Sequence, residues 1–198
     1  MITISAAALQ EAGRFDEARA AIEKALHLDP TRPEAHNTLG IVQLAEGKPD
    51  KAREEFELAS RIDPRNAHAF NNLGNVLRSL GRMDEAERAY RQAAAVAPRY
   101  AEPWNGLGTL EVERDRPAAA LSYFERALHL APSYHEVRLN RAIAYEMAGD
   151  PGAAAAAYRD FLVAAGDNPQ FAEQRRVARQ LLARLAGRTA NPAPSERR

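Results

Sequence analysis

The stretch FNNLGNVLRSLGRMDEAERAYRQAAAVAP, residues 70–98, carries the pattern that decides the fold. In each half, apolar residues recur every three or four positions, which is the spacing of one face of a helix. Gly81 lies between the halves, where a residue in a left-handed conformation ends a helix at little cost. Pro98 follows the second half and marks a boundary, because a proline inside a helix costs about 3 kcal/mol. The stretch therefore predicts two helices joined by a short turn.

The same pattern recurs along the chain with a period of 34 residues. The columns that keep this period are the prolines Pro30, Pro64, Pro98 and Pro132; the alanines Ala18, Ala52, Ala86, Ala120 and Ala154; the bulky residues Ile22, Phe56, Tyr90, Phe124 and Tyr158; and the Leu-Gly pairs 39–40, 73–74 and 107–108. Small residues let paired helices approach closely, and the bulky column fills the space beside them. A single pair cannot bury its apolar face, whereas a stack of pairs can, so we expect an all-α repeat array.

The period divides residues 1–168 into five expected repeats. Their bounds are 1–32, 33–66, 67–100, 101–134 and 135–168. The first repeat is incomplete, because Ser5 and Ala6 occupy the place of the Leu-Gly pair. The fifth is divergent, because Phe161 stands in an alanine column and Gly166 stands where the proline is expected.

The C-terminal end of the chain falls outside the period. Residues 169–187 carry Phe171, Val177 or Ala178, and several leucines near one helical face, with arginines on the other. This pattern predicts a capping helix, which covers the apolar edge of the last repeat. Residues 188–198 contain two prolines and no apolar cluster, and we expect them to be disordered.

The segments HNTLG, FNNLG and WNGLG, which begin at His36, Phe70 and Trp104, open repeats that resemble the tetratricopeptide (TPR) family. That family combines an aromatic residue, Leu-Gly, alternating small and bulky positions and a final proline over 34 residues. The resemblance implies a right-handed α-solenoid of helix-turn-helix repeats whose first helices line a concave groove. It also implies a non-catalytic role in binding other proteins.

The composition bounds the class of protein. The chain has 198 residues, no cysteine, and 27 basic against 27 acidic side chains, so disulfides and thiol chemistry are excluded and bulk charge is absent. No apolar run approaches the roughly 18 residues of a membrane span, and the N-terminus lacks the basic region of a signal peptide. We expect a cytoplasmic protein, or a periplasmic one if a leader has been removed. Residues 169–198 hold seven arginines and two glutamates, a pattern typical of a solvated helix face and a tail.

Asparagines gather on the first helices that the resemblance assigns to the groove. Asn37, Asn71 and Asn105 keep the 34-residue period, and Asn72 and Asn75 share a helical face with Asn71. A primary amide both donates and accepts, so a row of amides can bind the backbone of an extended peptide. The alternative is that the amides only tie neighbouring first helices together. The full set of expected groove residues is Asn37, Thr38, Ile41, His68, Asn71, Asn72, Asn75, Asn105, Thr109, Asn140 and Ile143.

A carboxylate clamp of the kind found in TPR chaperone adaptors is not expected. The matching positions hold Thr3, Ala7, His68 and Asn72, and none of these is a lysine or an arginine. The asparagine row is instead similar to the amide ladder of TPR arms attached to some glycosyltransferases, although this chain has no room for such a catalytic domain.

The sequence offers no catalytic, cofactor-binding or metal-binding set. His135 and Glu136 lack a histidine four residues later, at Leu139, so the zinc-protease pattern fails. No strand-turn-helix segment presents a nucleophilic serine. The expected groove includes Glu34 and Glu102, which would repel phosphate, so we expect neither nucleic-acid nor membrane binding.

We therefore expect a non-catalytic scaffold, present as a monomer or weak homo-oligomer, that binds an extended segment of a partner protein of unknown identity. Two alternatives remain open at this stage. The chain could be a regulatory or substrate-recruiting arm of a larger enzyme such as a glycosyltransferase, or an architectural repeat protein that assembles with itself.

Overall fold

The computed structural model describes residues 15–190, which form ten α-helices and contain no strand. The expectation of an all-α fold built from helix pairs is confirmed. The chain divides into two compact units, Met1–Gly106 and Leu107–Arg198, and the division falls inside helix α7 (Glu102–Glu113). Each unit is described here by itself.

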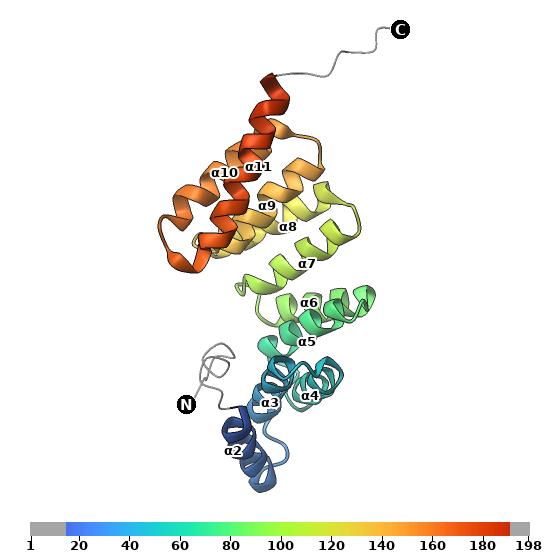
Figure 1. The fold of residues 1–198 in the computed structure, drawn as a ribbon. Helices are drawn as coiled ribbons and strands as arrows, with labels where there is room; N and C mark the ends of the chain where they lie inside the picture. Colours follow the sequence, from blue (N-terminus) through green and yellow to red (C-terminus); the bar gives the residue numbers. More distant parts are fainter. Residues whose placement is uncertain (1–14, 191–198) are drawn as a thin grey trace. The chain divides into compact units, whose positions relative to one another are not determined.

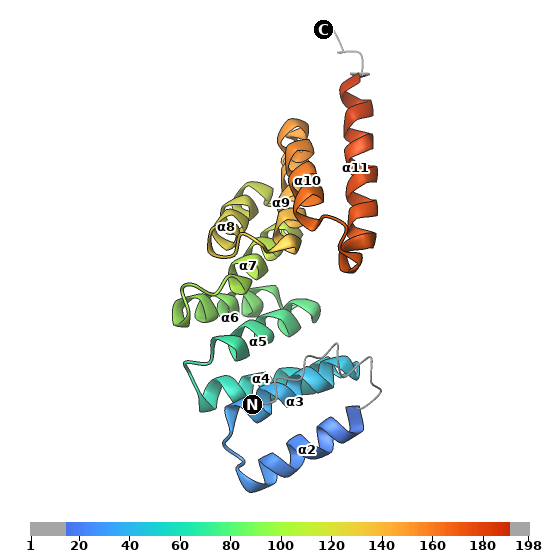
Figure 2. The ribbon, with the colours of Figure 1, turned by 90° about the vertical axis from the view of Figure 1, so that its left-hand side faces the viewer.

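The described part of unit 1 is a stack of helix pairs. It consists of α2 (Phe15–Leu28), α3 (Pro33–Ala45), α4 (Pro49–Ile62), α5 (Ala67–Ser79), α6 (Met83–Val96) and the first residues of α7 (Figure 1). Helix α3 packs against α4, and α5 packs against α6, while α4 and α5 join the two pairs (Figure 2). These pairs correspond to the second and third expected repeats.

Unit 2 repeats this arrangement and adds a final helix. It consists of the remainder of α7, α8 (Pro117–Leu130), α9 (His135–Met147), α10 (Pro151–Ala165), the short 3₁₀ turn η1 (Pro169–Phe171) and α11 (Ala172–Ala190). Helix α9 packs against both α8 and α10, and α11 packs against α10. Helix α11 continues to Ala190, so residues 188–190 are helical rather than part of a disordered tail, and residues 191–198 lie outside the described part of the chain.

A left-handed glycine ends the first helix of three repeats. Gly47, Gly81 and Gly149 have φ of 73°, 74° and 76°. The residue after each glycine donates its N–H to a carbonyl five residues earlier, as Arg82 does to Leu77 over 2.9 Å. This bond satisfies a carbonyl that the helix end would otherwise leave unpaired. The equivalent Gly13 lies outside the described residues.

The fourth turn has Asp115 where the others have glycine. Its φ is 58°, and Arg116 donates to the carbonyl of Glu111 over 2.8 Å, so the backbone of the turn is unchanged. A left-handed conformation costs a residue with a Cβ about 1–2 kcal/mol, although aspartate tolerates it better than most. The packing of the helix pair therefore imposes this turn on a residue that does not favour it.

Prolines separate the helices where the period predicts. Each inter-repeat proline lies two residues after the end of a helix, at Pro30, Pro64, Pro98 and Pro132. Three further prolines begin second helices, at Pro49, Pro117 and Pro151. The first position of a helix suits proline, because its missing N–H has no partner in the helix.

A glycine in the first helix of a repeat lies against an aromatic ring of the second. A Cβ added to Gly74 would lie 2.6 Å from the ring of Tyr90, and one added to Gly106 would lie 2.5 Å from the same ring. Tyr90 is fully buried between these two glycines. The same contact joins Gly40 to Phe56 and Gly108 to Phe124. The predicted function of the small and bulky columns is therefore confirmed.

Helix α11 covers the apolar edge of the fifth repeat. Phe171, Ala178 and Leu185 are buried in one cluster with residues of α9 and α10. Val177 is 37% exposed, so Ala178 rather than Val177 belongs to the buried face. Phe161, the divergent residue of the alanine column, packs edge-on against Phe171 with ring centroids 6.5 Å apart. The divergence of this repeat thus provides an aromatic contact for the capping segment.

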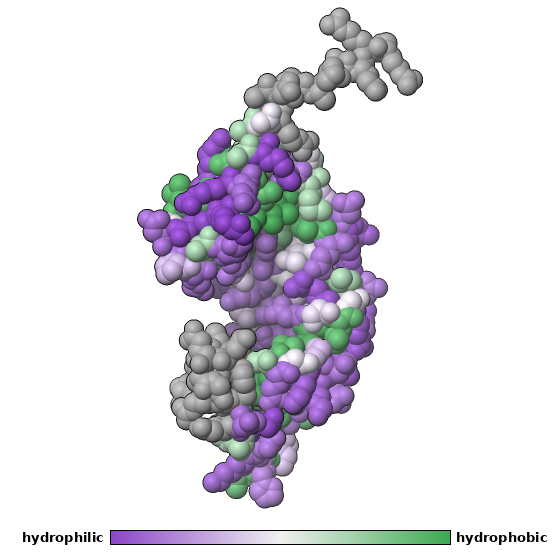
Figure 3. All heavy atoms as spheres, in the orientation of Figure 1, coloured by the Kyte–Doolittle hydropathy of each residue, from purple (hydrophilic) through white to green (hydrophobic). Residues whose placement is uncertain are grey.

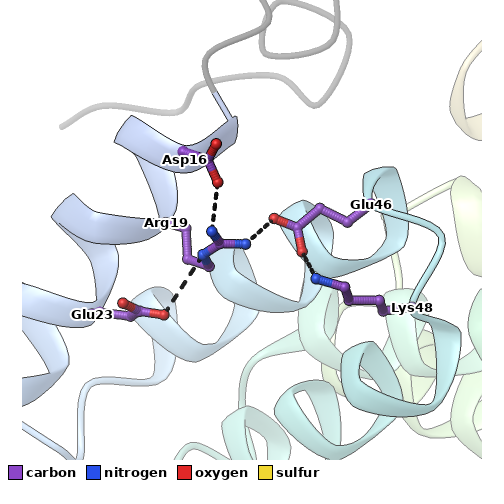
Figure 4. A network of polar contacts seen from close by, with 5 residues as sticks. All are labelled: Asp16, Arg19, Glu23, Glu46 and Lys48. Carbon is purple, nitrogen blue, oxygen red and sulfur yellow. Dashed lines mark hydrogen bonds and ion pairs between the residues drawn. The ribbon is translucent and has the colours of Figure 1, made fainter.

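An ion-pair network connects α2 to the end of α3 in unit 1 (Figure 4). Arg19 donates to Glu46 over 2.6 Å and to Asp16 over 2.5 Å, and Lys48 donates to the second oxygen of Glu46 over 2.6 Å. The hydrogen bond from Lys48 and the charge of Arg19 hold the pKa of Glu46 below its usual value. Glu46 therefore stays ionised in mildly acidic solution and holds α2 against the stack.

We expect Gly74→Ala to lower the free energy of unfolding by about 2 kcal/mol, because overpacking typically costs 1–3 kcal/mol. Tyr90 has no room to retreat, since Gly106 occupies its other side. Urea unfolding measures the effect. The matched control is Gly152→Ala, whose Cβ would meet only an oxygen of Asp150 at 3.5 Å and should leave stability nearly unchanged. Equal stability of Gly74→Ala and the wild type would contradict the packing described here.

Removal of the capping segment should destabilise unit 2. We expect a chain that ends at Asn168 to lose on the order of 5 kcal/mol, because fully burying one large apolar side chain is worth about 1.5–3 kcal/mol. A chain that ends at Ala190 keeps α11 and is the control. Thermal melting followed by circular dichroism compares the two chains, and identical melting temperatures would rule out the capping role.

Candidate partner-binding surface

The asparagines of unit 1 lie on α3, α5 and the start of α7. We call this set, Asn37, Asn71, Asn72, Asn75 and Asn105, the amide face of unit 1. Asn75 is exposed, Asn71 is buried, and the other three are half-buried. The predicted helical location of these residues is thus found, but their accessibility differs from one asparagine to the next.

Asn72 connects two neighbouring first helices. Its Nδ2 donates to Oδ1 of Asn37 over 3.0 Å, which joins α5 to α3. The two residues are 35 positions apart, one more than the period, because the bond links adjoining positions of successive repeats. The side chains therefore tie the stack together, as the alternative interpretation of the row requires, and both stay half-buried rather than enclosed.

Asn75 has a role in the core that the sequence did not indicate. The hydroxyl of the buried Tyr90 donates to Oδ1 of Asn75 over 2.7 Å. A buried phenol without a partner would cost about 1–3 kcal/mol, so this bond stabilises the helix pair. The bulky column uses phenylalanine in the second and fourth repeats, at Phe56 and Phe124, and those rings need no such acceptor.

Asn71 is only 5% exposed, and its Oδ1 has no hydrogen-bond partner within the described residues. The cause lies one repeat further on. Asn37 receives its bond from Asn72, and the residue 34 positions after Asn72 is Gly106. Gly106 has no side chain to donate, and the ring of Tyr90 leaves no space for one. Asn71 is therefore an acceptor whose donor is missing, and a ligand cannot reach its oxygen in this structure.

His68 begins the same face of α5. Its Nδ1 lies 3.0 Å from the hydroxyl of Tyr100, and the two rings meet edge-on with centroids 4.8 Å apart. His68 is exposed, so this pair forms an aromatic border beside the asparagines. Tyr100 therefore acts as a stacking residue at this edge of the amide face.

The remaining expected groove residues divide between the units. Thr38 and Ile41 of α3 are half-buried in unit 1, and Thr38 donates its hydroxyl to the carbonyl of Glu34 over 2.7 Å. Thr109, Asn140 and Ile143 are half-buried in unit 2. Thr3 and Ala7, two positions of the absent carboxylate clamp, lie outside the described residues.

One histidine outside this surface has two acceptor partners. Nδ1 of the buried His36 lies 2.7 Å from Oε2 of Glu55, and Nε2 lies 2.9 Å from the carbonyl of Pro30. Glu55 therefore does not face solvent alone, as its place on a second helix suggested. The pair ties the α2–α3 loop to α4 and is structural.

The described residues contain no group of three or more histidine, aspartate or glutamate side chains placed to hold a metal ion. None of the helices between residues 15 and 190 combines the length and apolar character needed to cross a bilayer.

Comparison with known proteins agrees with the repeat architecture. Sequence models of the tetratricopeptide repeat match residues 9–73, 65–133 and 105–169. No curated protein matches the chain in sequence.

Solved structures resemble the fold over most of its length. PilF of Pseudomonas aeruginosa is 26% identical, with a TM-score of 0.74 over 96% of this chain and 90% of its own. A thermophilic TPR protein of Thermus thermophilus is 25% identical, with a TM-score of 0.73 over 88% of this chain and 95% of its own. MamA is 23% identical, with a TM-score of 0.70 over 83% of this chain and 96% of its own, and shows likeness of fold alone.

We expect the bond between Asn37 and Asn72 to be measurable in a double-mutant cycle. Asn72→Ala and Asn37→Ala should each destabilise the chain, and the double variant should lose less than their sum by about 0.5–1.5 kcal/mol, the net value of one hydrogen bond. Urea unfolding of the four chains gives the coupling. Strict additivity would show that the two amides do not interact in solution.

Proposed function

Because the chain belongs to the tetratricopeptide repeat family, whose members are generally protein-interaction modules, we propose that it binds an extended segment of a partner protein along the first helices of unit 1. The proposed contact surface consists of His68, Asn37, Asn72, Asn75 and Asn105. Asn71 is left out of this surface because its side chain is buried. The role is that of a non-catalytic scaffold.

The observation that supports this proposal is the spare hydrogen-bonding capacity of Asn72 and Asn75. A primary amide offers two N–H donors and two acceptor lone pairs. The bond to Asn37 uses one donor of Asn72, and the bond from Tyr90 uses one lone pair of Asn75. These bonds also fix the orientation of both side chains, so the remaining groups meet a ligand in a prearranged position. The N–H and C=O groups of an extended peptide fit such a surface.

A photo-crosslinking experiment tests the proposal. A benzophenone amino acid replaces the exposed Glu34, which lies one helical turn before Thr38, and captures bound protein from cells for mass spectrometry. We expect Asn72→Ala to reduce capture several-fold, because a hydrogen bond to a ligand contributes about 0.5–1.5 kcal/mol. The matched control is Gln92→Ala, which removes an exposed amide from α6.

Asn75→Asp separates binding from stability. The aspartate keeps an oxygen that can accept from Tyr90 but loses both N–H donors. We expect normal melting and reduced capture. Unchanged capture by both Asn72→Ala and Asn75→Asp would overturn the proposed surface, and capture of the chain itself alone would favour self-assembly instead.

A further inference from the structure

Unit 2 contains an open hollow of about 490 Å³ between α9, α10 and α11. Its lining residues are Ile143, Glu146, Met147, Tyr158, Leu181 and Arg184. Binding pockets for small ligands and side chains have volumes of about 300–1,000 Å³, so the hollow is large enough for a large side chain. Among the lining residues, only Ile143 was expected from the sequence to contact a ligand.

The wall of the hollow is largely apolar. Ile143 and Met147 come from α9, and Leu181 comes from α11. Met147 is 42% exposed, one of few large apolar side chains of the described residues that remain so accessible. Figure 3 shows hydrophobic surface next to the hydrophilic surface of α11. An exposed apolar wall of this kind favours binding of an apolar group.

The charged residues of the hollow are unequally accessible. The hydroxyl of Tyr158 donates to Oε2 of Glu146 over 3.0 Å, and Arg184 donates to Oε1. Burial raises the pKa of Tyr158, so its hydroxyl stays protonated and keeps donating. The side chain of Glu146 is 18% exposed, whereas that of Arg184 is 57% exposed. The negative charge is therefore enclosed with both oxygens bonded, and the charge that meets a ligand is positive.

We propose that this hollow binds an apolar side chain of a partner protein segment that carries a carboxylate beside it. The apolar side chain packs on Ile143, Met147 and Leu181, and the carboxylate accepts from Arg184. A guanidinium has five N–H donors, so Arg184 can bind this carboxylate while it keeps its bond to Glu146. The hollow is open, whereas sites for free small molecules bury 70–90% of the ligand, so a side chain anchored by its own polypeptide is the better fit.

This inference rests on the proposed function only in taking a protein segment as the ligand, since it concerns unit 2 and not the amide face. The chain contains three methionines, Met1, Met83 and Met147, so methyl NMR of a methionine-labelled sample reports on the hollow through one signal. The probe is an acetylated, amidated hexapeptide of glycine and serine with a central leucine-aspartate. The control peptide has lysine in place of aspartate.

We expect the aspartate peptide to shift the Met147 methyl signal saturably in the millimolar range, with Met83 unmoved and the lysine peptide at least tenfold weaker. Arg184→Gln should weaken the aspartate peptide about tenfold, and Leu181→Trp, which fills the hollow, should abolish its effect. Arg179→Gln removes an exposed arginine of the same helix and should change nothing.

An unmoved Met147 signal, equal effects of the two peptides, or insensitivity to Arg184→Gln would each overturn the inference. A Met147 shift that depends on protein concentration without peptide would identify a second copy as the occupant and would also overturn it. If Met147 is silent while partners still crosslink at position 34, this inference alone fails. If Met147 responds while the amide variants capture normally, the proposed surface of unit 1 alone fails.

Discussion

The contact between a glycine of one helix and an aromatic ring of the next is the constraint on which each helix pair depends. Gly40, Gly74 and Gly108 each lie against the ring that stands 16 residues later, closer than any Cβ would permit. Since the rings are fully buried, they fix the distance between the paired helices. The short turns and the prolines then have only to connect helices whose separation is already set.

This contact also decides the chemistry of the amide face. Tyr90 needs a glycine on both sides, so Gly106 stands where an asparagine would have bonded to Asn71. Its hydroxyl needs an acceptor, which Asn75 provides. A single buried ring therefore leaves one amide without a donor and holds another in a fixed orientation. Core packing and the binding surface cannot be varied independently in this repeat.

The sequence predicted the fold well because each column of the 34-residue period corresponds to one contact or one helix boundary. It predicted less of the candidate site. Helical spacing places Asn71, Asn72 and Asn75 near one face, but it does not show that the first is buried or that the others already bond to Asn37 and Tyr90. The missing signal was available in part, since a tyrosine in place of phenylalanine requires a nearby acceptor. The hollow of unit 2 depends on how α11 lies against α9 and α10, which no local pattern encodes.

The central claim is that the buried ring of Tyr90 positions the amide face, and Tyr90→Phe tests it most directly. This substitution keeps the ring between its two glycines and removes only the hydroxyl that donates to Asn75. Side-chain amide NMR should show the Asn75 signal moving and broadening, while Asn140 in unit 2 stays in place. An Asn75 signal identical in the two chains would show that the core does not hold the amide and would contradict the account.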